Sequence, residues 1–98
     1  MSGAEDKYNL VWTARFKKEY QLARRRGLKI EKLDDIIRML VKGGEPPESL
    51  RDHELKGKWK GHRELHIESD WLLIYQKQDD ILVLELTRTG SHADLFSR

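Results

Sequence analysis

A chain of 98 residues is long enough for one domain with a modest core and too short for two. Its 38% apolar and 37% charged residues predict a densely charged surface, and a net charge of +2 does not by itself indicate nucleic-acid binding. The absence of cysteine excludes disulfides, thiol nucleophiles and thiolate metal sites. Because no apolar run approaches the roughly 18 to 20 residues of a membrane span and the polar N-terminus lacks a signal-peptide pattern, we expect a cytoplasmic protein with no membrane contact.

The first half of the chain predicts one strand followed by two helices. Residues 8–12 are rich in strand formers and follow a tail, residues 1–7, that we expect to be flexible. Thr13 can then cap a helix over 14–26, where apolar residues recur at helical spacing. The spacing is more regular over 30–42, which predicts a second helix. Two short helices bury too little by themselves, so their joint apolar stripe needs a sheet to cover.

Beyond residue 50 the apolar period changes from 3.6 to 2, which predicts a β-meander. Residues 89–96 are expected to leave the sheet as a loop, with Leu95 or Phe96 folding back onto it. The expected strands are 62–68, 70–77 and 81–88.

The predicted order is therefore β-α-α-β-β-β in a single α+β domain over residues 1–98. We expect an antiparallel sheet with the two-helix hairpin packed on one of its faces. The other face would then be free for a ligand.

Candidate chemistry gathers in the second half, which holds all four histidines. His66 alternates with the core-directed residues on either side of it and so points to the open face, while Asp70 follows the hairpin turn and could orient an imidazole or act as a base. His53 and His92 flank the sheet in predicted loops. Metal-free RNA cleavage needs a base for the 2′-hydroxyl, an acid for the leaving oxygen and a cation for the phosphorane, and two histidines and an arginine can supply them.

Each of these residues also has an interpretation that involves no catalysis. His66 could be an exposed histidine on a half-solvated strand, and Asp70 an ordinary turn residue. Trp71 could stack on a base, although a place in the core is the better interpretation of the sequence alone. Arg63 and Arg88 could hold a phosphate or form surface ion pairs with Glu64, Glu68 or Glu85.

A zinc site would be the alternative use of several histidines. His62 and His66 are four residues apart, which suits a helix, but in a strand that separation is about 13 Å. We therefore predict no metal site.

The second half carries a long pattern, H-x-L-x-G-x-W-x-G-x-R-x-x-H-I-x-x-D-W-x-L-I-Y over residues 53–75, closed by R-T-G-x-H at 88–92 and L-F at 95–96. With the helical hairpin before it, the chain resembles the YafQ family of toxins, which belong to the RelE/ParE superfamily of bacterial toxin-antitoxin modules. Two positions depart from the family pattern: Glu54 stands where proline is usual, and His62 where tyrosine is usual.

The resemblance implies a RelE-like fold and a ribosome-dependent, cofactor-free mRNA endonuclease that cuts in the decoding site of the 70S ribosome. It implies neutralisation by a DinJ- or RelB-like antitoxin of the ribbon-helix-helix type. Carried onto this sequence, the family's functional positions are His53, His66, Asp70 and His92 for acid-base chemistry, and Trp71 and Phe96 for placing the RNA. Arg63 and Arg88 join them as candidate phosphate ligands.

Two other function classes remain open from the residues alone. One is a non-enzymatic, ParE-like toxin that inhibits gyrase and does not need the histidines and the aspartate. The other is an RNA- or protein-binding module that uses Trp71 and the basic segments of the chain for stacking and phosphate contact.

Overall fold

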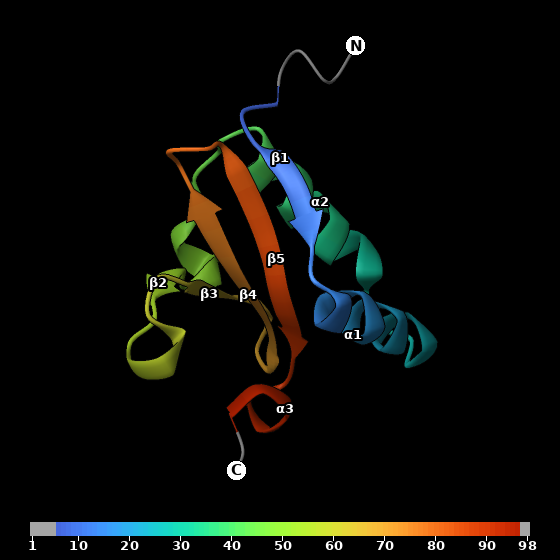
Figure 1. The fold of residues 1–98 in the computed structure, drawn as a ribbon. Coiled ribbons are helices and arrows are strands. Elements are labelled where there is room, and N and C mark those ends of the chain that lie inside the picture. Colours follow the sequence, from blue (N-terminus) through green and yellow to red (C-terminus); the bar gives the residue numbers. More distant parts are fainter. Residues whose placement is uncertain (1–5, 97–98) are drawn as a thin grey trace.

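A computed structural model describes residues 6–96 of the chain, which fold into one five-stranded sheet with two helices against it (Figure 1). The strand order is β1-β5-β4-β3-β2. The elements are β1 (Asn9–Trp12), α1 (Ala14–Arg25), α2 (Ile30–Val41), the 3-10 helix η2 (Glu48–Leu50), β2 (His53–Glu54), the 3-10 helix η3 (Gly57–Trp59), β3 (Arg63–Glu68), β4 (Trp71–Gln78), β5 (Val83–Gly90) and α3 (His92–Phe96).

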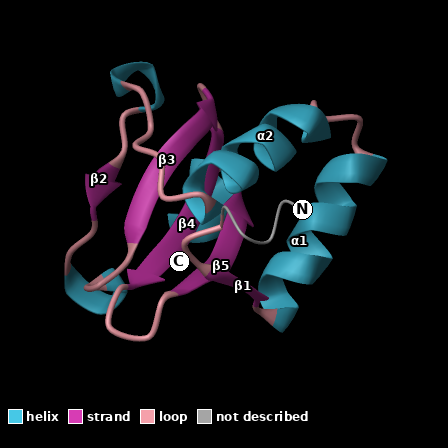
Figure 2. Cartoon of the chain, turned by 90° about the horizontal axis from the view of Figure 1, so that it is seen from above, coloured by secondary structure: helices cyan, strands magenta, loops and turns pink. Residues whose placement is uncertain are grey.

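The sheet is mixed because β1 joins it parallel to β5, whereas β2 to β5 are antiparallel. The α+β class and the helical hairpin on one face are confirmed, and α1 and α2 lie on the same side of the sheet (Figure 2). The strand over residues 8–12 was predicted, but its parallel pairing with β5 was not, and neither was the two-residue strand β2, where a loop was expected. Local periodicity shows that a segment is a strand but not which neighbour it pairs with.

Both predicted helices form close to their expected ends. Thr13 caps α1, since its Oγ1 accepts a hydrogen bond from the amide of Phe16 at 2.9 Å, and it also donates to the carbonyl of Thr87 at 2.9 Å. Gly27, with a φ of 78°, turns the chain after α1. The apolar stripe of α2 is buried over its whole length, as its regular spacing predicts.

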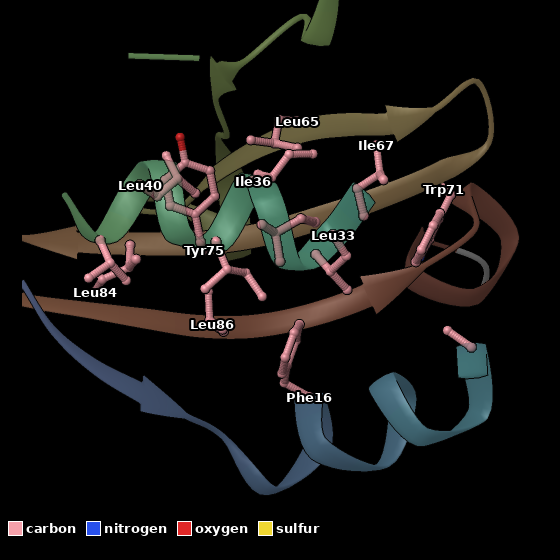
Figure 3. Packing of buried hydrophobic residues seen from close by; sticks show 14 of the residues in the cluster. Phe16, Leu33, Ile36, Leu40, Leu65, Ile67, Trp71, Tyr75, Leu84 and Leu86 are labelled. Carbon is pink, nitrogen blue, oxygen red and sulfur yellow. The ribbon is translucent and has the colours of Figure 1, made fainter. Parts of the chain in front are cut away.

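The main core lies between the helices and the sheet. Phe16 of α1 and the α2 stripe pack against inward-facing side chains of the three long strands (Figure 3). Burying this much apolar surface is the main favourable term in folding. The labelled core residues are Phe16, Leu33, Ile36, Leu40, Leu65, Ile67, Trp71, Tyr75, Leu84 and Leu86.

The second face of the sheet is not completely open. Leu72 and Ile74 of β4 are buried there beneath Leu95, with Leu55 and Trp59 packed against them. Of the two residues predicted to fold back onto the sheet, Leu95 does so, whereas Phe96 is exposed. This small cluster leaves the β3 side of the second face for polar side chains.

The last part of the chain differs from the expected strand and loop. Strand β5 runs from Val83 to Gly90, two residues later than predicted, because Leu82 adopts a left-handed φ of 54° in the preceding turn. The expected loop over 89–96 is instead the end of β5 and the short helix α3. Ser91 and Asp94 exchange side-chain-to-amide hydrogen bonds at 3.1 Å, which is the reciprocal arrangement that starts a helix.

The predicted flexible tail, residues 1–7, lies outside the described residues except for its last two positions. There the amide of Lys7 donates to the carbonyl of Val41 at 2.9 Å, so the chain is already held at that point. Within residues 6–96, no helix has both the length and the apolar character needed to cross a bilayer.

The cap of α1 provides a test of this fold. Thr13→Ala should lower the free energy of unfolding by about 1 kcal/mol, because the amide of Phe16 and the carbonyl of Thr87 both lose a partner. Thr13→Ser keeps the hydroxyl and should cost clearly less. Urea denaturation of the two variants measures the difference, and equal costs would contradict a capping role for the hydroxyl.

Candidate active site

His66 projects from β3 to the face of the sheet opposite the helices. Its neighbours Leu65 and Ile67 are buried in the main core, and His66 is paired across the strands with Leu72 of the second face. The pleat therefore places the imidazole where the alternation of the sequence predicts it. Its Nδ1 is buried and has no hydrogen-bond partner, as is also the case for Nδ1 of His62.

Asp70 and His92 form a pair at the end of the sheet where β3 turns into β4 and β5 passes into α3. One carboxylate oxygen, Oδ1, accepts from the backbone amide of His92 at 3.0 Å and lies 2.8 Å from Nδ1 of the same residue. The carboxylate thus fixes both the start of α3 and the rotation of the imidazole. Because Nδ1 faces an acceptor, Nε2 is the nitrogen that remains for a substrate.

The hydrogen bonds from His92 determine how Asp70 ionises. The backbone amide and then the imidazole of His92 lower the pKa of Asp70 from its ordinary value of 3.8. Asp70 is therefore a carboxylate at neutral pH and a weak proton acceptor. Of the two roles predicted for it, orienting an imidazole fits this environment better than acting as a base.

His66, His92 and Phe96 come together in one aromatic cluster. The ring centroids of His66 and His92 are 5.7 Å apart, and those of His92 and Phe96 are 6.4 Å apart. The cluster joins a strand to a helix 26 residues later in the chain. His92 and Phe96 are exposed and His66 is half-buried, so this cluster presents one imidazole and a phenyl ring to solvent with a second imidazole partly covered beside them.

His53 takes part in a second carboxylate-imidazole pair on the same face. Strand β2 pairs His53 with Glu64 of β3, and Nε2 of His53 lies 3.2 Å from the Glu64 carboxylate. The Glu64 side chain is 6% exposed, whereas that of His53 is 51% exposed. Glu64 is two residues from His66 along the same face of β3, a separation of about 7 Å, so the second pair lies close to the aromatic cluster.

Glu64 is the functional candidate that the sequence interpretation missed, since it considered this residue only as a partner for arginine. The sequence did contain a signal. Glu64 is two residues from His62 and two from His66, and residues two apart in a strand lie on the same face. What the alternation does not show is that His53 returns to meet it, because that depends on the short strand β2.

Both arginines proposed as phosphate ligands are already engaged. Arg63 lies on the helix side of the sheet, where its Nε donates to Asp52 at 2.6 Å. Arg88 forms a two-nitrogen ion pair with Glu19 of α1, with Nη2 at 2.6 Å and Nε at 3.0 Å. Ion pairing was the alternative interpretation, but the partners are Asp52 and Glu19 and not the nearby glutamates of the sheet.

Trp71 is a core residue. It is 4% exposed, packs in the main core, and donates from Nε1 to the hydroxyl of Thr89 at 3.0 Å. The hydroxyl of Thr89 in turn donates to the carbonyl of Leu72 at 2.7 Å. This packing leaves no ring face free for a base, so Trp71 anchors the turn that carries Asp70 next to it. Phe96 is the ring of the predicted RNA-binding pair that solvent can reach.

Two hollows flank the site. One, of about 290 Å³, lies beside His66 and is also lined by Ser49, Arg51 and Ser69. The other, of about 580 Å³, lies between α1 and the strand ends, and its lining includes Asp70, Arg15 and Arg26. The basic segment of α1 thus borders a groove that reaches the candidate active site.

The histidines do not gather around a common centre for a metal. His62 packs edge-on against Trp59, with ring centroids 5.6 Å apart, and contributes to neither carboxylate pair. Across residues 6–96, no group of three or more histidine, aspartate or glutamate side chains is placed to hold a metal ion.

Comparisons of this chain with protein-family models, curated proteins and solved structures all point to the same family. The family model described as "Bacterial toxin of type II toxin-antitoxin system, YafQ" matches residues 8–97. The "mRNA interferase toxin YafQ" of Escherichia coli K12 is 38% identical over 89 residues, which cover 90% of this chain and 95% of that protein.

Two solved structures share the fold. The toxin in the crystal structure of the E. coli DinJ-YafQ toxin-antitoxin complex superposes with a TM-score of 0.85 at 36% identity, covering 92% of this chain and 98% of that one. A crystal structure of a metal-bound toxin from Helicobacter pylori gives a TM-score of 0.85 at 30% identity, covering 91% and 99%.

The pKa of Asp70 tests the geometry of the carboxylate-imidazole pair. Because the folded-state pKa is lowered, the Asp70–His92 contacts should persist below pH 3.8 and be lost only as the pH falls through the lowered value. Carboxyl ¹³C NMR during an acid titration measures it, and His92→Gln should move the pKa of Asp70 back toward 3.8. An Asp70 that titrates at or above that value in the wild-type protein would contradict the pairing.

Proposed function

Because the chain belongs to the YafQ family of bacterial type II toxin-antitoxin toxins, we propose that it is an mRNA endoribonuclease that cuts messages on the ribosome. The observation that carries the proposal is the cluster of the half-buried His66 with the exposed His92 and Phe96, in which Asp70 orients the imidazole of His92. Two neighbouring imidazoles can divide the acid-base work of the reaction. One takes the proton of the 2′-hydroxyl, and the other gives a proton to the leaving oxygen.

The proposed reaction attacks the scissile phosphate with the adjacent 2′-hydroxyl. A base takes the hydroxyl proton, the new bond between O2′ and phosphorus forms as the bond between phosphorus and O5′ breaks, and an acid protonates the leaving O5′. The products are a 2′,3′-cyclic phosphate and a 5′-hydroxyl. A nucleic acid without a 2′-hydroxyl cannot react in this way, so the site is restricted to RNA.

Contacts in the structure favour particular roles for the residues. The Asp70 carboxylate holds His92 by Nδ1 and supports a positive charge on the ring, which suits His92 to give a proton from Nε2 to the leaving oxygen. His66, whose ring lies beside that of His92, is then the base. Phe96 borders His92 and can stack on a base of the message.

His53 is the third histidine that a substrate can reach, since its side chain is 51% exposed, and we place it beside the phosphorane. Its Nδ1 lies 2.9 Å from the carbonyl of Arg51 and its Nε2 lies 3.2 Å from the Glu64 carboxylate. Both neighbours hold the ring in one orientation, and a contact between His53 and the phosphorane replaces one of the two.

The partners follow from the same family membership. A ribbon-helix-helix antitoxin of the DinJ or RelB type would neutralise the protein, since the E. coli relative was crystallised with DinJ. The basic face of α1 is exposed and suits either ribosomal RNA or an acidic segment of the antitoxin. The place of action is the cytoplasm, where the 70S ribosome presents mRNA in its decoding site.

Cleavage of a defined mRNA in a purified translation system tests the function. The wild-type protein should cut only when ribosomes are present, and His66→Gln and His92→Gln should each lower the rate by about 100-fold to 10,000-fold. The matched control is His62→Gln, which changes a histidine outside both pairs and should cleave nearly as fast as the wild-type protein. Primer extension locates the new 5′ ends.

Two results would contradict the proposal. Normal cleavage by both His66→Gln and His92→Gln would remove these residues from the chemistry. No cleavage by folded, antitoxin-free protein would favour a toxin that acts without cutting RNA, such as a gyrase inhibitor.

A further inference from the structure

Asp52 and His53 are consecutive residues whose side chains lie on opposite faces of the sheet. His53 is paired with Glu64 on the second face, and its imidazole contacts that carboxylate. Asp52 turns to the helix side, where it meets Arg63 and Tyr75, two residues that are themselves paired across β3 and β4. Asp52 is thus bound inside the protein, whereas His53, the next residue, is half exposed to solvent.

Asp52 is firmly held. Its Oδ1 accepts from Nε of Arg63 at 2.6 Å, its Oδ2 accepts from the hydroxyl of Tyr75, and its side chain is only 11% exposed. Tyr75 is completely buried in the main core. Burial and the hydrogen bond to Asp52 raise the pKa of Tyr75 far above its ordinary value of 10, so the phenol carries its proton and remains a donor at neutral pH.

The backbone of His53 is held on one side by its pairing with β3, which the amide of Leu55 extends by donating to the carbonyl of His62 at 2.9 Å. Strand β2 is two residues long, and the residue before Asp52, Arg51, has a left-handed φ of 54° that a non-glycine side chain adopts at a cost. A conformation of this kind persists only when surrounding contacts hold it. The amide of Arg51 donates to the carbonyl of Glu48 at 2.9 Å on one side of this residue, and the contacts of Asp52 hold the chain on the other side, next to His53.

We propose that Asp52, bound by Arg63 and Tyr75, positions His53, so that these three residues serve the reaction from the far side of the sheet. The inference rests on the function proposed above. It gives Arg63 a different role from the phosphate contact expected from sequence: Arg63 acts through Asp52 and does not touch the RNA. Asp52, Arg63 and Tyr75 are positioning residues, whereas His53 is the group that faces the substrate.

Tyr75→Phe isolates this effect because it removes one hydroxyl and keeps the buried ring. Tyr8→Phe is the matched control, since Tyr8 is also buried and its hydroxyl also donates to a carboxylate, that of Asp79. Asp79 lines the same hollow as Asp52, but among the described residues no hydrogen bond joins it to Asp52, Arg63 or Tyr75. With ribosomes as the varied substrate, Tyr75→Phe should lower kcat about tenfold and leave KM within about twofold, because it disturbs a group that acts in the transition state. Tyr8→Phe should change neither.

A double-mutant cycle separates positioning from general support of the fold. In a His53→Ala background, Tyr75→Phe should change kcat by less than about twofold, because the group that it positions is gone. An equal loss in both backgrounds would overturn the proposal, as would full activity of Tyr75→Phe in the wild-type background. If Tyr75→Phe does not fold, Asp52→Asn allows the same comparison, since it removes the charge that binds Arg63.

Ring ¹⁵N and ¹H NMR signals of His53 provide a readout that does not depend on activity. Tyr75→Phe should shift these signals and leave those of His92 in place, whereas Tyr8→Phe should shift neither set. Unchanged His53 signals overturn the positioning role whatever the cleavage rates are. Shifted signals in a protein whose wild type cuts no RNA would support the positioning link and contradict the proposed function instead.

Discussion

The alternation of side chains over residues 63–67 of β3, before the irregularity between His66 and Glu68, is the constraint on which the rest of the site depends. Leu65 and Ile67 must enter the core beneath the helices, and the pleat then directs Glu64 and His66 to the opposite face. A shift of one residue in register would move Glu64 and His66 into the main core and take Leu65 and Ile67 out of it, which makes any other arrangement costly. The hydrophobic core therefore selects the position of the reactive face without contacting it.

A second requirement is that the ends of separate strands meet, and Glu19 provides the connection. Its carboxylate accepts from the guanidinium of Arg88 and, at 3.0 Å, from the amide of Thr89, which joins α1 to the end of β5. The hydroxyl of Thr89 continues the connection to Trp71, the residue after Asp70. Asp70 and His92 thus meet because the two chain segments that carry them are bound to the same buried network.

The two carboxylate-imidazole pairs differ in a way that matters for chemistry. Asp70 and His92 are both exposed, so a substrate can approach the free nitrogen of His92 directly. Glu64 is buried and its carboxylate faces His53, whose two ring nitrogens both lie near acceptors of the protein. The first pair is suited to exchanging protons with a substrate, and the second is suited to holding an imidazole in one orientation.

The sequence by itself determined both helices, the hairpin of β3 and β4, and the face to which His66 points, because each follows from the spacing of apolar residues within one element. Its resemblance to a family marked His53, Asp70, His92 and Phe96 before any contact was known. Only the tertiary structure decided the partners: His92 meets an aspartate 22 residues away, His53 meets Glu64, and Arg63 and Arg88 bind internal carboxylates. Periodicity describes a segment's apolar face, whereas these pairings depend on strand order and on where strands end, which no local pattern encodes.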